Sequence, residues 1–172
     1  MRKHEAEINP KVGIITVSTS RWEKFGGVND VNKMEEVKDE SGKTIKDLLD
    51  FEVIGYKLVP DDKQRIVSAF RELIEKVDVI ITTGGTGISP KDVTIEALEP
   101  LVDKKLNGFG EIFRMLSYKE VGSAAILSRA FAGVVNGKVV FCLPGSKKAV
   151  KLAMELINPS IRHVISHARG LK

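Results

Sequence analysis

The sequence has one cysteine, few aromatic residues and no long hydrophobic run. Cys142 is the single cysteine among 172 residues, so a disulfide framework is excluded. The longest apolar stretches have the length of a β-strand, far short of the ~20 residues that cross a bilayer. The basic N-terminal stretch has only a short apolar segment and lacks the small-residue cleavage site of an export signal. We therefore expect a cytoplasmic protein without a membrane segment.

The charge of the chain is modest, and its basic residues are scattered. A total of 27 lysines and arginines against 23 acidic residues gives a formal net charge of +4. No RNA- or DNA-binding motif accompanies them, so we expect no nucleic-acid partner; a solvated surface and a small anionic ligand fit the charge equally well. No repeat or linker divides the sequence, and we expect residues 1–172 to form a single domain.

Apolar runs rich in β-branched residues predict the strands. Three strands are predicted over 11–18, 52–60 and 78–83. The first run is nearly continuous, as in a strand that is covered on both faces, and the third also indicates a buried strand. The segment 130–144 predicts two further strands joined at Asn136-Gly137, a dipeptide typical of tight hairpins.

Helical patterns alternate with these strands. They span 41–52, 61–77, 91–101, 110–122, 147–158 and 159–170. The stretch 21–40 has no clear period and predicts a long loop. This alternation indicates an α/β sandwich with a mostly parallel sheet and one antiparallel hairpin. Because ligands of such sheets bind beyond the carboxyl ends of the strands, Ser18, Pro60 and Thr83 are expected on one functional edge.

Three glycines follow the third predicted strand, in the motif TTGGTG at residues 82–87. The motif lacks the Gly-Lys-Ser/Thr ending of a Walker A loop, and its spacing is not G-x-G-x-x-G. An ordinary turn needs one or two glycines. Three, flanked by Thr83 and Thr86, favour a nest, meaning a concave set of backbone N–H groups that binds phosphate, formed at Gly84, Gly85 and Gly87.

Asp61 and Asp92 each have two interpretations. Asp61 can cap a helix with Gln64 at its third position, and Asp92 can complete a capping box that begins at Ser89. Both also follow strands that should be neighbours, so both can point into the crevice beside the glycines. Two carboxylates near phosphates are the usual protein ligands of Mg²⁺.

A second loop, LPGSKK at residues 143–148, repeats the order of strand, loop and helix. Gly145 and Ser146 can donate hydrogen bonds to an anion, and Lys147 or Lys148 can add charge; a helix cap at Ser146 is the alternative. His163 and His167 lack a third metal ligand and indicate a solvated helix face. No catalytic serine or cysteine pattern is present, so the nucleophile should belong to the substrate.

Three stretches together resemble the MoaB/MogA family of molybdenum cofactor biosynthesis proteins, which is related to the G domain of gephyrin. They are TTGGTGISPKDVTIEAL (82–98), GFGEIFRMLSYKEVGSAAILSRAFAGV (108–134) and FCLPGSKKAVKLAMELI (141–157). The second and third resemble the MoaB branch in particular. The resemblance implies a three-layer α/β/α sandwich that forms homo-oligomers, trimers or hexamers.

The resemblance also implies an activity, the Mg²⁺-dependent adenylylation of molybdopterin with ATP as co-substrate and release of pyrophosphate. Molybdopterin and ATP are then the ligands, and the molybdenum insertion protein is a further partner. The family's essential aspartates correspond to Asp61 and Asp92, and its acidic residue after GFG to Glu111. The first strand departs from the family's usual Ser-Asp-Arg, because Ser20 replaces the acid.

The resemblance assigns the site residues by role. Catalysis is expected of Asp61, Asp92 and Glu111, with Mg²⁺ held by Asp61 and Asp92. Phosphate binding is expected of Thr83, Gly84, Gly85, Thr86 and Gly87, and binding of the pterin substrate of Ser18, Thr19, Ser128, Gly145, Ser146 and Lys147. Two alternatives remain: a nucleotide pyrophosphatase of the competence-damage-related type, which differs in its products, and a non-catalytic pterin-binding scaffold, which would not need both aspartates.

Overall fold

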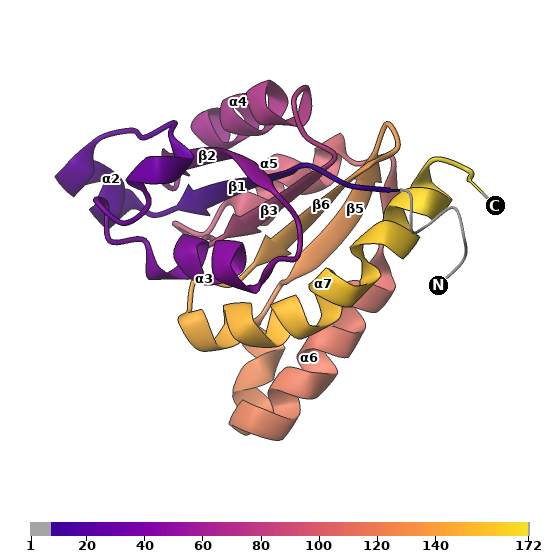
Figure 1. Cartoon of the computed structure of the whole chain (residues 1–172). Helices are drawn as coiled ribbons and strands as arrows, with labels where there is room; N and C mark the ends of the chain where they lie inside the picture. The colour runs from indigo at the N-terminus through magenta and orange to yellow at the C-terminus, as the bar shows by residue number, and fades with distance from the viewer. Residues whose placement is uncertain (1–7, 172) are drawn as a thin grey trace.

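The fold is built around one six-stranded sheet (Figure 1). The computed structural model describes residues 8–171, and the strands lie in the order β2-β1-β3-β6-β5-β4. The strands are β1 (Val12–Val17), β2 (Val53–Val59), β3 (Val79–Thr83), β4 (Lys104–Lys105), β5 (Phe131–Val135) and β6 (Lys138–Leu143). The pairs β1–β2, β1–β3 and β3–β6 are parallel, whereas β5 runs antiparallel to β6 and to the two-residue β4. The mostly parallel sheet is confirmed; β4 was not predicted.

The hairpin between β5 and β6 turns at the two residues that the sequence indicated. Asn136 and Gly137 have φ angles of 49° and 72°. Positive φ at both central residues is the geometry of the tight turn that matches the twist of the flanking strands. The predicted hairpin is confirmed.

Helices cover both faces of the sheet. They are α2 (Thr19–Phe25), α3 (Glu40–Leu48), α4 (Lys63–Ile74), α5 (Thr94–Leu98), α6 (Asn107–Val121) and α7 (Lys147–Ala168), with 3₁₀ turns η1 (Val31–Lys33), η2 (Glu99–Leu101) and η3 (Gly122–Leu127). Core residues of α3, α6 and α7 pack on one face, and those of α4 and α5 on the other. The result is the three-layer α/β/α arrangement seen in Figure 1. No helix within residues 8–171 has the length and apolar character to span a membrane.

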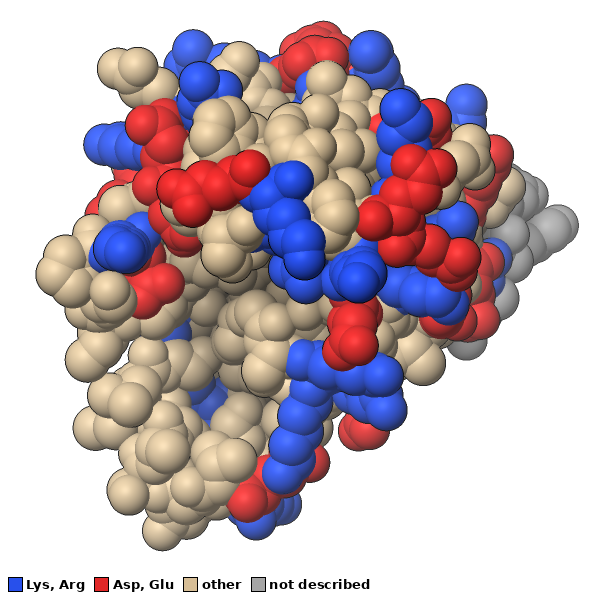
Figure 2. Space-filling model, turned by 90° about the vertical axis from the view of Figure 1, so that its left-hand side faces the viewer, with Lys and Arg blue, Asp and Glu red and all other residues tan. Residues whose placement is uncertain are grey.

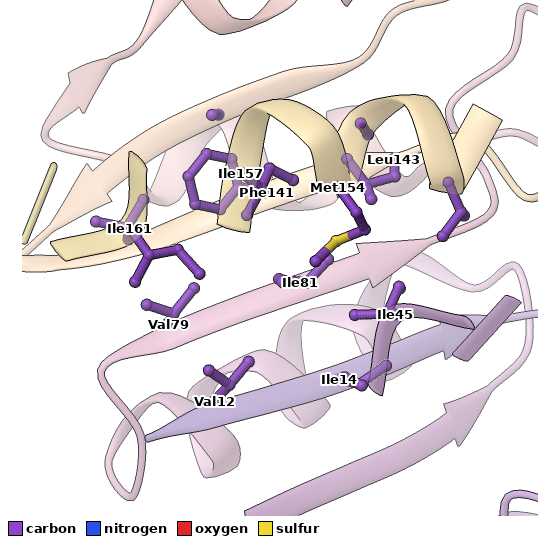
Figure 3. Close-up of a cluster of buried hydrophobic side chains, with 14 of the residues drawn as sticks. Val12, Ile14, Ile45, Val79, Ile81, Phe141, Leu143, Met154, Ile157 and Ile161 are labelled. Carbon is purple, nitrogen blue, oxygen red and sulfur yellow. The ribbon is translucent and has the colours of Figure 1, made fainter. Parts of the chain in front are cut away.

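Alternation along the central strands explains their continuous apolar sequence. In β3, Val79 and Ile81 face the layer of α3 and α7, while Ile80 faces α4 and α5. Figure 3 shows the first of these cores, in which side chains of β1, β3 and β6 meet those of α3 and α7. Each such side chain contributes roughly 1.5–3 kcal/mol when fully buried, so both faces of the sheet must be apolar.

The prediction of a long loop over 21–40 was wrong in part. Helix α2 begins at Thr19, and the turn η1 follows it. Val28, Met34 and Val37 are buried, and the Val28 carbonyl accepts a hydrogen bond from the Leu58 N–H of β2. These apolar residues anchor the segment singly, without a period, which is why the sequence pattern did not show it.

The predicted break between two C-terminal helices was also wrong. Pro159 lies inside the single 22-residue helix α7. A proline within a helix costs about 3 kcal/mol, because it lacks an N–H and crowds the preceding turn. Here Ile157, Ile161 and Ile165 are fully buried on both sides of it. Burial of these three side chains outweighs the cost of the proline.

Other helix boundaries differ from the predicted ones by several residues. The helix expected at 41–52 ends at Leu48, which is exposed rather than part of the apolar face. The helix expected at 91–101 is the short α5 followed by η2, and α6 begins three residues before 110. The amphipathic helix expected at 61–77 is confirmed as α4, and its buried face includes Ile66 and Phe70.

Candidate active site

The carboxyl ends of four parallel strands meet at one edge of the sheet. In register, Val17 of β1 lies beside Val59 of β2, and Thr83 of β3 lies between Thr16 of β1 and Leu143 of β6. The loops after these strands therefore converge at the predicted edge. The strands that precede Asp61 and Asp92 were expected to be neighbours, which was wrong, because β1 lies between β2 and β3. A cavity of about 540 Å³ opens there, lined by residues 84–87, Asp92, the loop 144–146 and parts of α6, η3 and α7. Asp92 lines this cavity, and Asp61 does not. Figure 2 looks onto this edge and shows the molecule hollowed there.

The glycine loop, residues 84–87, depends on glycine at two positions. Gly84 and Gly85 have φ angles of 98° and 70°, which side chains disfavour. A Cβ atom at Gly84 would lie 2.2 Å from the Val17 carbonyl oxygen, and one at Gly85 would lie 2.2 Å from the Thr94 Oγ1. These glycines are therefore required by the protein's own packing, apart from any ligand.

The loop presents unpaired backbone donors to the cavity. Gly84 N–H donates to the Leu143 carbonyl at 3.0 Å, which ties the loop to β6. Within residues 8–171, the N–H groups of Gly85, Thr86 and Gly87 have no acceptor. Thr83 does not face a ligand with its hydroxyl, because its Oγ1 donates to the Pro144 carbonyl at 3.0 Å. Three adjacent N–H groups without partners are the arrangement that binds phosphate.

Asp61 is hydrogen-bonded to Thr19, and the alternative interpretation of Asp61 as the cap of α4 is wrong. Its Oδ2 accepts from the Thr19 hydroxyl at 2.7 Å and from the Thr19 N–H at 3.2 Å, while its own N–H donates to the Thr19 Oγ1. The cap of α4 is Asp62, whose Oδ1 accepts from the Arg65 N–H. Asp61 Oδ1 would lie 3.3 Å from a Cβ at Gly85, so the carboxylate borders the glycine loop.

Asp92 borders the other end of the glycine loop and lines the cavity. Its Oδ2 accepts from the Ser89 N–H at 3.0 Å and would lie 2.6 Å from a Cβ at Gly87. Residues 89–92 form a turn rather than the first turn of a helix, because α5 begins only at Thr94. The predicted capping box at Ser89 is therefore wrong, although the contact between Ser89 and Asp92 exists.

Asp61 and Asp92, on either side of the glycine loop, offer the type of ligand atom that Mg²⁺ prefers. Each uses its Oδ2 within the protein, and among the described residues neither Oδ1 accepts a hydrogen bond. No cluster of three or more His, Cys, Asp or Glu residues within 8–171 could hold a metal by itself. Mg²⁺ commonly takes one or two carboxylates and completes its octahedron with water and substrate phosphates, so two free carboxylate oxygens suffice.

The second loop, residues 144–146, forms the neighbouring wall of the cavity. Gly145 is exposed, and its carbonyl accepts from the Ser41 hydroxyl of α3 at 2.6 Å. Ser146 caps α7 by accepting from the Ala149 N–H at 3.2 Å. Lys148 lines the cavity and pairs with Glu120 of α6 at 3.6 Å, whereas Lys147 is not among the lining residues. The first turn of α7 thus presents N–H groups and a lysine to the same space.

The structure does not bring all predicted substrate residues together. Ser18 caps α2 by accepting from the Arg21 N–H, and Thr19 is occupied by Asp61. Ser128 lies on the wall between this cavity and a second hollow of about 410 Å³. Glu111 lies in that second hollow and does not line the first.

Sequence reasoning missed several residues of the site. Arg129 bonds the glycine loop from the side away from the cavity, and Thr94 does so from the start of α5. Glu96 receives two hydrogen bonds from the Arg129 guanidinium, which lowers the pKa of the Glu96 carboxyl. Arg129 lies in the stretch 108–134 that resembles the family, but the sequence does not show which groups its side chain contacts.

Cys142 does not supply a nucleophile to the site. The side chain of Cys142 is fully buried in β6, and burial raises the pKa of its thiol to about 12. The thiolate is therefore absent at neutral pH.

Sequence and structure comparisons give the family. The protein-family model described as "Probable molybdopterin binding domain" matches residues 13–163 of this chain. The chain belongs to this family. A curated "Probable molybdopterin adenylyltransferase" of Methanocaldococcus jannaschii is 43% identical over 168 residues, covering 96% of this chain and 98% of that protein. A "Molybdopterin adenylyltransferase" of Pyrococcus furiosus is 45% identical, covering 97% and 96%.

A solved member of the molybdopterin-binding family has the same fold. The crystal structure of "tungsten cofactor synthesizing protein MoaB" from Pyrococcus furiosus superimposes with a TM-score of 0.80 at 44% identity, covering 94% of this chain and 98% of that one. The expected membership of the MoaB branch is confirmed.

Proposed function

We propose that this protein transfers AMP from ATP to molybdopterin, in the biosynthesis of the molybdenum cofactor. The observation that carries the proposal is the placement of two carboxylates, Asp61 and Asp92, at either end of a glycine loop with unpaired N–H groups. The adenylyltransferases of the family, similar over nearly the whole chain, support the same reaction. The substrates are then ATP and molybdopterin, and the single domain acts in the cytoplasm.

The reaction needs no covalent intermediate with the protein. An oxygen of the terminal phosphate of molybdopterin attacks the α-phosphorus of ATP, the bond from that phosphorus to the bridging oxygen breaks, and pyrophosphate leaves. The N–H groups of Gly85, Thr86 and Gly87 bind phosphate oxygens and need little reorganisation as charge develops. Bound at Asp61 and Asp92, Mg²⁺ would neutralise charge on the phosphates.

The rest of the cavity suits the other part of such a ligand. Phe113, Leu127 and Leu152 contribute apolar surface, and the capped start of α7 with Lys148 provides a second place for a phosphate. An apolar wall beside two anion-binding loops fits a flat ring that carries a phosphate. We propose that Glu111 supports the reaction from the adjacent hollow, without contacting a ligand in this cavity.

We also propose that the protein works as a homo-oligomer, a trimer or hexamer. The support is a group of exposed apolar side chains on α6 and η3, namely Ile112, Met115, Tyr118, Val121, Ile126 and Leu127. Figure 2 shows a lobe below the hollow, at the height of α6, that is mostly tan, with charged residues along its lower right side. Patches of this kind mark contacts between proteins. The adenylylated product would pass to the molybdenum insertion protein.

Product analysis tests the proposed reaction. The purified protein is incubated with molybdopterin, Mg²⁺ and ATP labelled at the α-phosphate, and we expect the label on the pterin together with free pyrophosphate. Label in free AMP, with none on the pterin, would instead identify a nucleotide pyrophosphatase. Binding of both ligands without any transfer would identify a scaffold and contradict the proposal.

A further inference from the structure

Every carbonyl group of the glycine loop is bonded by one of two residues. Thr94 donates from its Oγ1 to the Gly84 carbonyl at 2.9 Å and from its N–H to the Gly85 carbonyl at 3.1 Å. Arg129 donates from its N–H to the Thr86 carbonyl at 3.3 Å and from its Nε to the Gly87 carbonyl at 2.9 Å. No other residue within 8–171 bonds these four oxygens.

The directions of these carbonyl groups determine the directions of the N–H groups in the loop. In a planar trans peptide, the carbonyl of one residue and the N–H of the next point in opposite directions. The N–H groups of residues 85–88 are therefore directed away from Thr94 and Arg129. Residues 84–87 line the cavity and these two do not; Arg129 lines the second hollow instead. The carbonyl groups on one side of the loop are hydrogen-bonded to Thr94 and Arg129. The N–H groups on the other side remain available to a ligand.

The guanidinium of Arg129 is itself fixed. Its two terminal nitrogens donate to both oxygens of Glu96 on α5, and one of them also donates to the Asp92 carbonyl at 3.3 Å. A bidentate pair between arginine and carboxylate holds the planar group in one orientation. Arg129 thus joins the glycine loop, Asp92 and α5. Thr94 is fully buried, so its hydroxyl has no competing water.

We propose that Thr94 and Arg129 are positioning residues that orient the N–H groups of the glycine loop toward the phosphates, with Glu96 fixing the arginine. The inference rests on the proposed function in that it assumes a phosphorylated ligand in the cavity. Neither residue touches the ligand. Their effect is to leave the donors prearranged, so that binding does not have to order a flexible glycine segment.

Matched variants test this with inorganic pyrophosphate as the probe, in the presence of Mg²⁺. Isothermal titration gives the affinity and the fraction of competent protein separately. Thr94→Val keeps the shape but removes the hydroxyl and should raise Kd about tenfold; Thr94→Ser keeps the hydroxyl and should stay within about twofold of wild type. Arg129→Met should raise Kd about tenfold or more. Arg65→Met, which changes an arginine over the Trp22 ring at 5.0 Å, is the control.

The outcomes separate this inference from the proposed function. Unchanged affinity in Thr94→Val and Arg129→Met, or a reduced competent fraction with unchanged affinity, would overturn the positioning role, as would a wild type that does not bind pyrophosphate. If Arg129→Met does not fold, Glu96→Gln carries the test, with an expected rise in Kd of about threefold. Weakened variants in a protein that transfers no AMP would support the positioning role and refute the proposed reaction.

Discussion

Asp61 and Asp62 are adjacent residues with different partners, and this difference gives a test at the scale of single residues. Asp61→Asn should abolish AMP transfer while the melting temperature stays within about 2 °C, because the amide oxygen still accepts from Thr19. Asp62→Ala should cost about 1 kcal/mol through the lost cap of α4 while activity per folded molecule is retained. Single-turnover transfer and urea unfolding measure the two effects, and the reverse pattern would exchange the two roles.

Asp92 should contribute charge rather than structure. Asp92→Asn retains an acceptor for the Ser89 N–H but offers Mg²⁺ no negative charge. We expect the rate of transfer to fall by about a hundredfold or more with unchanged stability, the usual scale for one electrostatic stabiliser. Asp47→Asn, on the exposed side of α3, is the matched control. A loss of stability with normal activity per folded molecule would leave Asp92 as a turn residue only.

Site residues that belong to a sequence motif could be predicted. Residues that reach the site only through tertiary contacts could not. The glycines and Asp61 come soon after strand ends, and Asp92 lies in the loop that continues from the glycines, so the carboxyl ends of the strands bring them to one edge. Arg129 and Glu96 reach the glycine loop only through the path of α5 and of the segment between η3 and β5, which local pattern does not determine. The sequence likewise could not show that Thr19 holds Asp61, since 42 residues separate them.

At the scale of elements, α3 and β2 are joined by a buried carboxylate. Asp39, the cap of α3, accepts from the Tyr56 hydroxyl at 2.7 Å and from the Thr16 hydroxyl. Burial, together with Asp39, raises the pKa of Tyr56 above its usual value near 10. The folded state therefore holds this proton more tightly than the unfolded state does. The stability that Tyr56 contributes is present below pH 10 and is lost as pH rises above it.

This linkage predicts how Tyr56→Phe behaves in alkaline solution. At pH 8 the variant should be less stable by roughly 1–3 kcal/mol, because Asp39 loses a buried donor. Above pH 10 the difference from wild type should shrink, since only the wild type loses stability through Tyr56 ionisation. Urea unfolding of both proteins between pH 8 and pH 11 measures it. A constant difference over that range would show that Tyr56 does not link folding to pH.

Helices and strands with regular burial were predicted from the sequence, whereas those with irregular burial were not. The central strands β1 and β3 are buried at every position and α4 is buried along one face, and the sequence predicted all three. Helix α2 has no buried residue, so its sequence lacks the apolar stripe from which a helix is predicted. In α7 the tertiary burial of isoleucines around Pro159 overrides the local rule that proline ends a helix.

At the scale of the whole molecule, the exposed apolar side chains of α6 should govern assembly. Met115 and Tyr118 are 54% and 64% exposed. A charge placed between contacting subunits would remain desolvated, so Met115→Glu together with Tyr118→Glu should convert the proposed oligomer into monomers. Ile54→Glu, at an exposed apolar position on β2, should leave assembly unchanged. Light scattering after gel filtration measures the mass, and an unaltered oligomer in the double variant would place the interface elsewhere.

The order of strands has a consequence for how the chain is made. β6 lies in the middle of the sheet, between β3 and β5, although it follows both in the sequence. During synthesis from the N-terminus, β1, β2 and β3 can associate early, but the edge of β3 stays without its partner until residues 138–143 have emerged. An unpaired apolar strand is a surface for aggregation, and parallel pairing over long sequence distances is slow. The nascent chain is thus most exposed to misassembly, and most in need of chaperones, while the segment from α5 to β5 is being translated.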